Sequence, residues 1–227
     1  MKPYVICHMM TSVDGRIKTD RWNLKKSDDV YEKIGGKIKS DGWIVGRTTA
    51  EELADSKSRK AVAAKSPIDK TDFVAEHRAK SFAVSIDPKG KVNWKSGKLD
   101  SDHVIEVLTE NVSSEFLHYL RGKKVSYIFG GETSLDLAVV LKKLKKLFGI
   151  KRIIVEGGGT NNGSFLQAGL IDELSLIVAP VADGTLGDPT LFDLVPQKST
   201  SAATPLKLMS VKRLKKNFLL LRYKFVT

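Results

Sequence analysis

Short apolar runs alternate with amphipathic segments along most of this chain. Several runs are continuously apolar, which is typical of strands that are covered on both faces of a sheet. The runs of strand length are Tyr4–Met9, Trp43–Val45, Phe82–Ile86, His103–Leu108, Val125–Phe129, Arg152–Val155, Leu174–Ala179, Leu206–Val211 and Asn217–Phe225. We expect these runs to build the sheet of the fold.

Helical patterns lie between the apolar runs. The strongest covers Thr133–Leu147, where the final leucines are three residues apart, lysines fall between them, and Gly149 follows as a stop. A second helix is expected from its cap Ser27 to Lys39, with Asp28 and Asp29 in the first turn. Shorter helices are expected at Ser113–Leu120, at Asn161–Ala168 and in a segment that ends at Leu53.

The alternation of strands and helices predicts an α/β fold with a largely parallel sheet. From Leu174 onward three strand patterns follow without a helix, and the last two resemble a hairpin around Lys212–Lys216, so the sheet should be mixed. Two polar segments, Ala54–Lys70 and Asp183–Thr204, are expected to be loops, the first of them mobile. Because strands on both sides of each loop are needed for one sheet, we predict a single domain over residues 1–227.

Charge and composition narrow the classes of function. The net charge of +12 favours anionic partners such as nucleotides and sugar phosphates. Much of the excess lies on Leu141–Leu147, and aromatic residues make up only 7%, so no nucleic-acid partner is expected. The lone cysteine, Cys7, excludes an internal disulfide and is compatible with a reducing, cytoplasmic location. No apolar run is long enough to span a bilayer, so no membrane partner is expected.

Histidine placement gives no sign of a metal site or of a catalytic triad. The four histidines are scattered along the chain without the spacing of metal ligands, and core or surface roles are the simpler interpretation. We therefore predict no metal, and the sequence alone identifies no catalytic residue.

The most informative segment joins a buried strand to a helix through Glu156 and three glycines, Gly157–Gly159. Glycine lacks a Cβ atom, so the backbone of such a turn can approach a ligand closely and adopt positive φ at little cost. The helix that follows offers unpaired N–H groups and the positive end of its dipole, which suit a phosphate. A tight strand-to-helix turn without a ligand is the alternative interpretation.

Three other strand ends carry glycine or polar residues. Thr11–Ile17 favours a turn whose side chains bond their own backbone. Ile44–Thr49 brings an arginine fork and two hydroxyls that suit phosphate oxygens, although Thr48 or Thr49 could simply cap the next helix. Phe129–Glu132 again joins a strand to a helix. Because ligands bind along the carboxyl edge of open α/β sheets, these strand ends together predict a nucleotide cofactor.

Two common nucleotide motifs are absent. The turn from Gly157 to Gly163 has the pattern G-x-G-x-x-x-G rather than the Rossmann G-x-G-x-x-G. No acidic residue follows at the end of a strand about 20 residues on, where it would bind a ribose. A Walker A turn with Gly-Lys-Ser/Thr is missing as well.

Taken together, these motifs resemble the reductase domain of riboflavin biosynthesis, a branch of the dihydrofolate-reductase-like superfamily. The matching segments are Ser12–Arg16, Gly46–Thr49, Val155–Thr160, Ser164–Leu174 and Ala179–Pro180, in an order and spacing that cover nearly the whole chain. The resemblance implies a three-layer α/β/α domain with a mixed, mostly parallel sheet and a C-terminal β-hairpin. It also implies NADPH as cofactor, a homodimer, and reduction of the ribosyl group of a phosphorylated aminopyrimidine to a ribityl group by hydride transfer to the sugar C1.

The resemblance assigns roles to particular residues. Asp14, Lys37 and Glu156 would face the substrate, and Lys37 stands where the family commonly has an arginine, which keeps the charge but loses the bidentate fork. Trp22 would lie beside the cofactor. Arg47 and Thr48 are added on physical grounds as candidates for the 2′-phosphate. The other cofactor contacts would come from Ser12, Gly46, Thr49, Gly157, Gly158, Gly159, Thr160, Asn161, Asn162, Gly163 and Ser164.

One departure and two alternatives remain open. The sugar-phosphate motif that the family usually shows after Thr49 is missing, so the exact substrate is undetermined, and Lys57 or Arg59 could replace that motif. The zinc-binding deaminase motif of bifunctional relatives is also absent, so only reductase activity is expected. Dihydrofolate reductase or a related pterin reductase is the alternative within the superfamily, with Asp28 or Asp29 holding the pterin. A non-enzymatic nucleotide- or nucleic-acid-binding domain is the alternative from another class.

Overall fold

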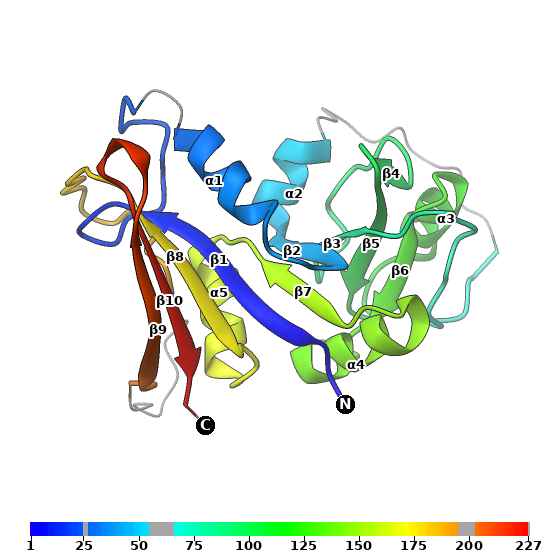
Figure 1. The fold of residues 1–227 in the computed structure, drawn as a ribbon. Coiled ribbons are helices and arrows are strands. Elements are labelled where there is room, and N and C mark those ends of the chain that lie inside the picture. Colours follow the sequence, from blue (N-terminus) through cyan, green and yellow to red (C-terminus); the bar gives the residue numbers. More distant parts are fainter. Residues whose placement is uncertain (25–26, 55–65, 195–202, 227) are drawn as a thin grey trace. The chain divides into compact units, whose positions relative to one another are not determined.

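The computed structural model describes residues 1–24, 27–54, 66–194 and 203–226, which fall into two compact units (Figure 1). The first unit contains residues 1–3 and 40–153, and the second contains residues 4–39 and 154–227. Strand β7 (Arg152–Val155) carries the chain from the first unit into the second. The expectation of a single domain stays a prediction.

The first unit is built on a mostly parallel sheet. Strand β3 (Phe82–Ile86) pairs in parallel with β2 (Gly42–Gly46) and with β5 (Asp102–Leu108), and β5 pairs in parallel with β6 (Ser126–Phe129). The two-residue strand β4 (Lys98–Leu99) is antiparallel to β5. The helices of this unit are α2 (Arg47–Ala54), α3 (Ser114–Gly122) and α4 (Leu137–Phe148). Its core gathers side chains such as Trp94, Leu117 and Tyr127, all nearly inaccessible to solvent.

The second unit contains a mixed sheet and two helices. Strand β1 (Tyr4–Thr11) is parallel to β8 (Glu173–Val178), and β10 (Leu219–Phe225) is antiparallel to both β8 and β9 (Leu206–Arg213). Helices α1 (Ser27–Gly35) and α5 (Gly159–Gln167) complete the unit. A short 3₁₀ turn, η1 (Lys215–Asn217), joins the last two strands into a hairpin. The core here includes Met10, Trp22, Ile177 and Phe218.

The α/β class, the mixed sheet and the C-terminal hairpin are confirmed. Most predicted boundaries differ by one or two residues, and three differences have identifiable local reasons. Helix α4 begins at Leu137 rather than at Thr133, because the Asp136 carboxylate accepts hydrogen bonds from the N–H groups of Ala138 and Val139 at 2.8 and 3.1 Å and caps the helix there. Helix α1 ends at Gly35, where a second glycine follows. Strand β10 begins after η1, whose Lys216 and Asn217 adopt positive φ.

Helix α2 begins at Arg47, so Thr48 and Thr49 lie in its first turn and neither is the N-cap. Strand β4 was not predicted, because two residues leave no periodicity. Of the two expected loops, residues 55–65 and 195–202 lie outside the described residues, and with them Lys57 and Arg59. Within the described ranges, no helix is long and apolar enough to cross a membrane.

A buried carboxyl pair lies in the core of the first unit. Glu106 and Asp87 are both inaccessible to solvent. The Trp94 Nε1–H donates to Glu106 Oε2 at 2.7 Å, and Asp87 Oδ2 accepts from the backbone N–H groups of Lys91 and Val92. Burial, followed by the nearby Asp87, raises the pKa of Glu106 well above its usual range. Glu106 is therefore held in its protonated form.

Glu106→Gln should stabilise the protein at pH 7–8 and leave its stability unchanged at pH 4. As the pH rises above the unfolded carboxyl pKa of about 4.3, the unfolded chain loses the Glu106 proton while the folded protein keeps it, so the wild type loses stability. Each unit of pKa difference corresponds to about 1.4 kcal/mol. Urea unfolding at both pH values measures the effect. Glu52→Gln, at an exposed site on α2, is the control and should be neutral at both; an equal gain at pH 4 and pH 8 would contradict the explanation.

Candidate active site

A small pocket opens in the second unit beside the carboxyl end of β1. Its volume is about 220 Å³. Two carboxylates and a phenol face it, with apolar and hydroxyl side chains around them. The lining residues are Met9, Met10, Ile17, Thr19, Asp28, Tyr31 and Glu156. The pocket thus combines hydrogen-bond acceptors with an apolar wall.

Local structure explains how these side chains come together. Met9 and Met10 are the buried last part of β1, and Glu156 follows the end of β7 directly. Asp28 and Tyr31 are three residues apart on α1, so they share one face of that helix. Strand ends and one helix face therefore converge on the same space, as expected at the carboxyl edge of an α/β sheet.

Tyr31 is fixed by two contacts beside the pocket. Its hydroxyl donates to the backbone carbonyl of His8 at 3.0 Å, and its ring stacks on the His8 imidazole with centroids 4.6 Å apart. Burial, followed by the charge of Glu156, raises the pKa of Tyr31 well above its usual range. His8 is itself buried against Ser175, and this burial lowers the pKa of the imidazole. Tyr31 therefore stays a neutral phenol close to Glu156.

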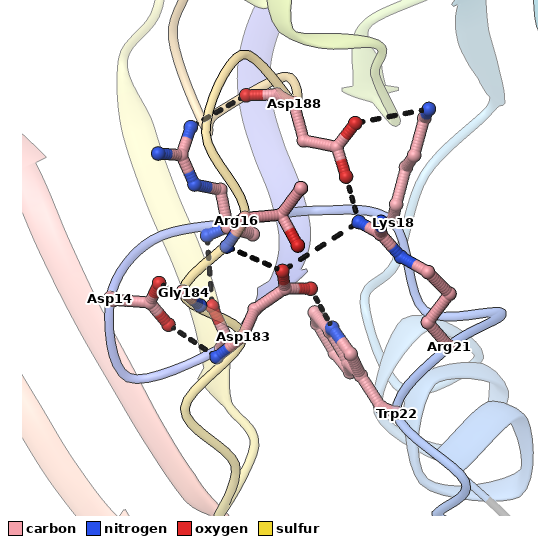
Figure 2. A network of polar contacts seen from close by, with 10 residues as sticks. Asp14, Arg16, Lys18, Arg21, Trp22, Asp183, Gly184 and Asp188 are labelled. Carbon is pink, nitrogen blue, oxygen red and sulfur yellow. Dashed lines mark hydrogen bonds and ion pairs between the residues drawn. The ribbon is translucent and has the colours of Figure 1, made fainter.

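Two loops of the second unit are tied together next to the pocket (Figure 2). The Asp14 carboxylate accepts hydrogen bonds from the backbone N–H groups of Asp183 and Gly184, both at 2.8 Å. These two backbone bonds lower the pKa of Asp14. The Asp183 carboxylate in turn accepts from Trp22 Nε1 at 2.7 Å. Asp14 and Trp22 thus hold the 183–184 turn in this structure.

The same loops are joined a second time through Asp188 (Figure 2). Its carboxylate pairs with Lys18 at 3.2 Å and with Arg21, while its backbone carbonyl accepts from Arg16 Nη1 at 2.6 Å. Ile17 N–H also donates to the carbonyl of Pro189 at 3.3 Å. Because Ile17 and Thr19 line the pocket, this network fixes one of its walls.

The glycine turn divides into positions with different structural demands. Gly157 has φ of +97° and requires glycine for that reason, and its peptide bond to Gly158 is cis. At Gly159 and Gly163 a Cβ atom would clash with Thr190 or Asp193 in the 190–193 segment, so close packing explains both. At Gly158 a Cβ atom would meet nothing within 4 Å, at an ordinary φ of −70°. Packing therefore does not explain the glycine at this position.

The N-terminus of α5 offers hydrogen-bond donors at this turn. Gly158 is the N-cap, and no side chain caps the helix. Asn161 Nδ2 donates to Gly157 O and Ser164 Oγ to Thr160 O, so both side chains bond the turn itself. Asn162 is buried, donates to Leu191 O at 3.0 Å, and leaves its Oδ1 without a partner among the described residues. The uncapped helix end beside open space at Gly158 fits a phosphate.

Other predicted cofactor residues lie in the first unit. Gly46 ends β2, and Arg47, Thr48 and Thr49 form the start of α2. Arg47 Nη1 pairs with both oxygens of Glu51, at 2.7 and 2.8 Å. Such a partly exposed i,i+4 pair is worth only about 0.3–0.5 kcal/mol, so a phosphate could replace it. Their role toward a cofactor stays a prediction.

Three of the predicted contacts occupy other places in the second unit. Lys37 does not line the 220 Å³ pocket but a neighbouring groove with Lys33 and the η1 lysines. Ser12 is buried, and its Oγ accepts from Arg16 N–H at 2.9 Å. Trp22 lies in the apolar core with its N–H on Asp183. Their predicted ligand contacts also stay predictions.

Tyr31 is a polar residue of the pocket that the sequence pattern did not single out. Its spacing from Asp28 on an expected helix was the available signal, because residues three apart share a face. Met9, Met10, Ile17 and Thr19 were missed too, since an apolar strand end and a loop carry no chemical signature. Within the described residues, no cluster of His, Cys, Asp and Glu is arranged to hold a metal ion.

Comparisons with known proteins place this chain among pyrimidine reductases by sequence similarity. A curated 2,5-diamino-6-ribosylamino-4(3H)-pyrimidinone 5′-phosphate reductase of Methanothermobacter thermautotrophicus is 27% identical over 195 residues, which is 85% of each chain. The protein of the same name from Archaeoglobus fulgidus is 26% identical over 201 residues, covering 85% of this chain and 87% of the relative.

Solved structures show the same fold. A pyrimidine reductase-like protein from Corynebacterium diphtheriae superposes with a TM-score of 0.72 at 18% identity, covering 99% of this chain and 92% of the other. The riboflavin biosynthesis reductase Rib7 of Saccharomyces cerevisiae gives a TM-score of 0.61 at 17% identity, with 99% and 90% covered. The sequence model of the family described as RibD C-terminal domain matches residues 3–220. This chain therefore belongs to the RibD C-terminal domain family.

Proposed function

We propose that this protein is an NADPH-dependent reductase that converts the ribosyl group of 2,5-diamino-6-ribosylamino-4(3H)-pyrimidinone 5′-phosphate to a ribityl group. The observation that carries the proposal is the pocket lined by Asp28, Tyr31 and Glu156, where Glu156 directly precedes the glycine turn. Curated relatives with this activity in their names support it over dihydrofolate reduction and over a non-enzymatic binding domain.

The chemistry of the pocket suits an aminopyrimidine. The substrate carries two amino groups and a ring N–H, all of which donate hydrogen bonds. Asp28 and Glu156 present carboxylate oxygens, which accept such bonds with the added strength of their charge. Met9 and Met10 offer adaptable apolar surface to a flat ring. Donors on the ligand would thus face acceptors on the protein.

The chain's own groups position the reactants. Tyr31 remains protonated and fixed on the His8 carbonyl, so it places no second negative charge beside the Glu156 carboxylate. The Asp183 and Asp188 contacts fix the loop that brings Ile17 and Thr19 to the pocket wall. Such positioning, together with exclusion of water, can supply a large part of a rate enhancement.

The glycine turn fits the diphosphate of a nicotinamide coenzyme. Open space at Gly158 and the uncapped N-terminus of α5 would receive it, and Arg47 with Thr48 are the candidates for the 2′-phosphate of NADPH. When bound, the nicotinamide supplies the hydride that the sugar C1 accepts.

Oxidation of NADPH in the presence of the pyrimidinone phosphate tests the function. We expect turnover with this substrate, weaker turnover with NADH, and none with dihydrofolate. Direct identification of the ribityl product by mass, two hydrogens heavier than the substrate, confirms where the reducing equivalents go. NADPH oxidation by dihydrofolate alone, or binding of neither coenzyme, would contradict the proposal.

The proposal includes the homodimer that the resemblance implies. Strand β9 is the last strand of the second unit's sheet, and its Leu208, Met209 and Val211 side chains are about half exposed, at 51, 51 and 55%. An apolar edge strand of this length is a surface that proteins usually cover.

Sedimentation should give twice the chain mass of 25.0 kDa. Val211→Lys should shift the protein to the single-chain mass, whereas a wild-type monomer would contradict the proposal.

A further inference from the structure

A second pocket, strongly basic, lies within the first unit. Its volume is about 420 Å³, which is within the range of small-molecule sites. Four cationic side chains and two imidazoles line it. They belong to Arg78, Lys98, Lys123, Lys124, His77 and His103. The proposed reaction assigns no role to these residues.

Strand direction places this pocket on the edge opposite to the expected cofactor residues. His103 lies at the start of β5, Arg78 precedes β3, and Lys124 precedes β6. These three strands run parallel to one another and to β2, whose carboxyl end carries Gly46. The basic pocket is therefore at the amino edge of this sheet and is not part of the proposed coenzyme site.

Positive charge exceeds negative charge in the lining of this pocket. Within the described residues, none of the four forms an ion pair with a carboxylate. Glu76 is the one acidic residue of the lining. Like charges that face one cavity repel each other, and an anion in the cavity would remove that repulsion.

Tight backbone packing holds the lysines side by side. Gly97 N–H donates to the carbonyl of Lys123 at 2.6 Å, and a Cβ atom at Gly97 would clash with the carbonyl of Lys124. Lys98 follows Gly97 directly, so its position next to Lys123 and Lys124 is fixed by this contact. Lys124 itself has φ of +57°, a conformation uncommon for lysine. The fold therefore fixes the backbone positions from which these three exposed lysine side chains extend.

Two histidine rings lie at the same place. The His77 and His103 rings stack with centroids 4.3 Å apart, and His103 Nε2 bonds Ser126 Oγ at 2.7 Å. Burial, followed by the neighbouring His77, lowers the pKa of His103 to about 4, so this ring is neutral at pH 7. His77 Nδ1 is buried without a hydrogen-bond partner among the described residues.

We propose that this pocket binds a small phosphorylated metabolite through its phosphate group, at a second site apart from the reductase pocket. Converging cations and N–H donors recognise phosphate oxygens. A polynucleotide is a poorer match, because single strands follow an extended basic groove with aromatic platforms, whereas here the charges surround one cavity.

Calorimetric titration with inorganic pyrophosphate tests the proposal on the full-length chain. In the presence of saturating NADPH, which occupies the glycine turn, we expect saturable 1:1 binding, and at least about tenfold weaker binding by the double variant Lys98→Gln/Lys124→Gln, since hydrogen bonds to charged groups are the strong ones. The matched control is Lys89→Gln/Lys142→Gln, which removes the same charge from exposed positions of the same unit outside the pocket. Proton NMR of the imidazoles at constant pH should show pyrophosphate-dependent shifts for His77 and His103.

Three results would overturn the proposal. Equal weakening by both lysine pairs would mean that only the overall positive field attracts the anion. Loss of pyrophosphate binding in Gly158→Val, with the lysine variants unaffected, would place the anion at the glycine turn. Tight binding of a single-stranded oligonucleotide that pyrophosphate does not displace would assign the pocket to nucleic acid. The first two results would leave the proposed reductase function intact, so the two proposals fail independently.

Discussion

Gly158→Val should abolish measurable NADPH binding while leaving the stability of the protein nearly unchanged. A Cβ atom at this position meets nothing within 4 Å, and φ of −70° with ψ of −171° is open to valine. The branched side chain would therefore occupy the open space in front of the uncapped N-terminus of α5, where we place the coenzyme diphosphate. We expect the Kd for NADPH to rise at least about a hundredfold, equivalent to about 2.7 kcal/mol.

Fluorescence titration with NADPH and a thermal melt together measure this effect. Gly122→Val is the matched control, because Gly122 also has open space around its Cβ position but ends α3 in the first unit. The control should keep both its Tm and its NADPH affinity. Wild-type affinity in Gly158→Val would show that the diphosphate does not lie at this turn.

Strands that are buried on both faces were the most predictable part of the fold. β3 and β7 have the ends expected from their apolar runs, Phe82–Ile86 and Arg152–Val155. The C-terminal hairpin was also visible, because two strand patterns flank a short basic segment without a helix between them. For β3 and β7 the signal is burial itself, which makes each run continuously apolar and needs no knowledge of distant neighbours.

Features that depend on a single side-chain contact were not predictable. The start of α4 is decided by the Asp136 cap, whose two hydrogen bonds outweigh a helical pattern that extends further upstream. Gly159 and Gly163 look like ligand-facing glycines in the sequence, yet their missing side chains accommodate Thr190 and Asp193, about thirty residues away. Among these three glycines, Gly158 is the one whose missing side chain is not explained by packing, and the cofactor contacts of the whole turn stay predictions.

In the candidate site, too, some residues were predictable from local patterns and others depend on contacts made only after folding. Glu156 was expected to face a ligand and lines the pocket, because a polar residue directly after a buried strand must lie at the sheet edge. Asp14 was expected there too, but its carboxylate bonds two backbone amides of the 183–184 turn. A sequence shows that an acid follows a strand, whereas it does not show which amides lie opposite that acid after folding.

Glu156→Gln and Asp28→Asn should each lower kcat/KM for the pyrimidinone phosphate by roughly 10- to 150-fold. This range corresponds to the loss of one hydrogen bond to a charged group, which contributes about 1.5–3 kcal/mol. Both changes keep the size of the side chain and remove the charge, and the new amide presents an N–H group to the donors of the ring. The effect should fall mainly on KM for Asp28→Asn, since α1 supplies only binding contacts. Steady-state kinetics with saturating NADPH measure both variants.

Asp29→Asn is the control that makes this test specific. Asp28 and Asp29 are neighbours in the first turn of α1, both exposed, and they interact with the helix dipole in the same way, so their loss should cost similar stability. Only Asp28 lines the 220 Å³ pocket, while Asp29 lines the neighbouring groove with Lys37. Asp29→Asn should therefore change kcat/KM less than twofold. If Asp29→Asn is the impaired variant and Asp28→Asn is not, the substrate lies in the lysine-lined groove, as the family resemblance of Lys37 implies, and the assignment of the pocket is wrong.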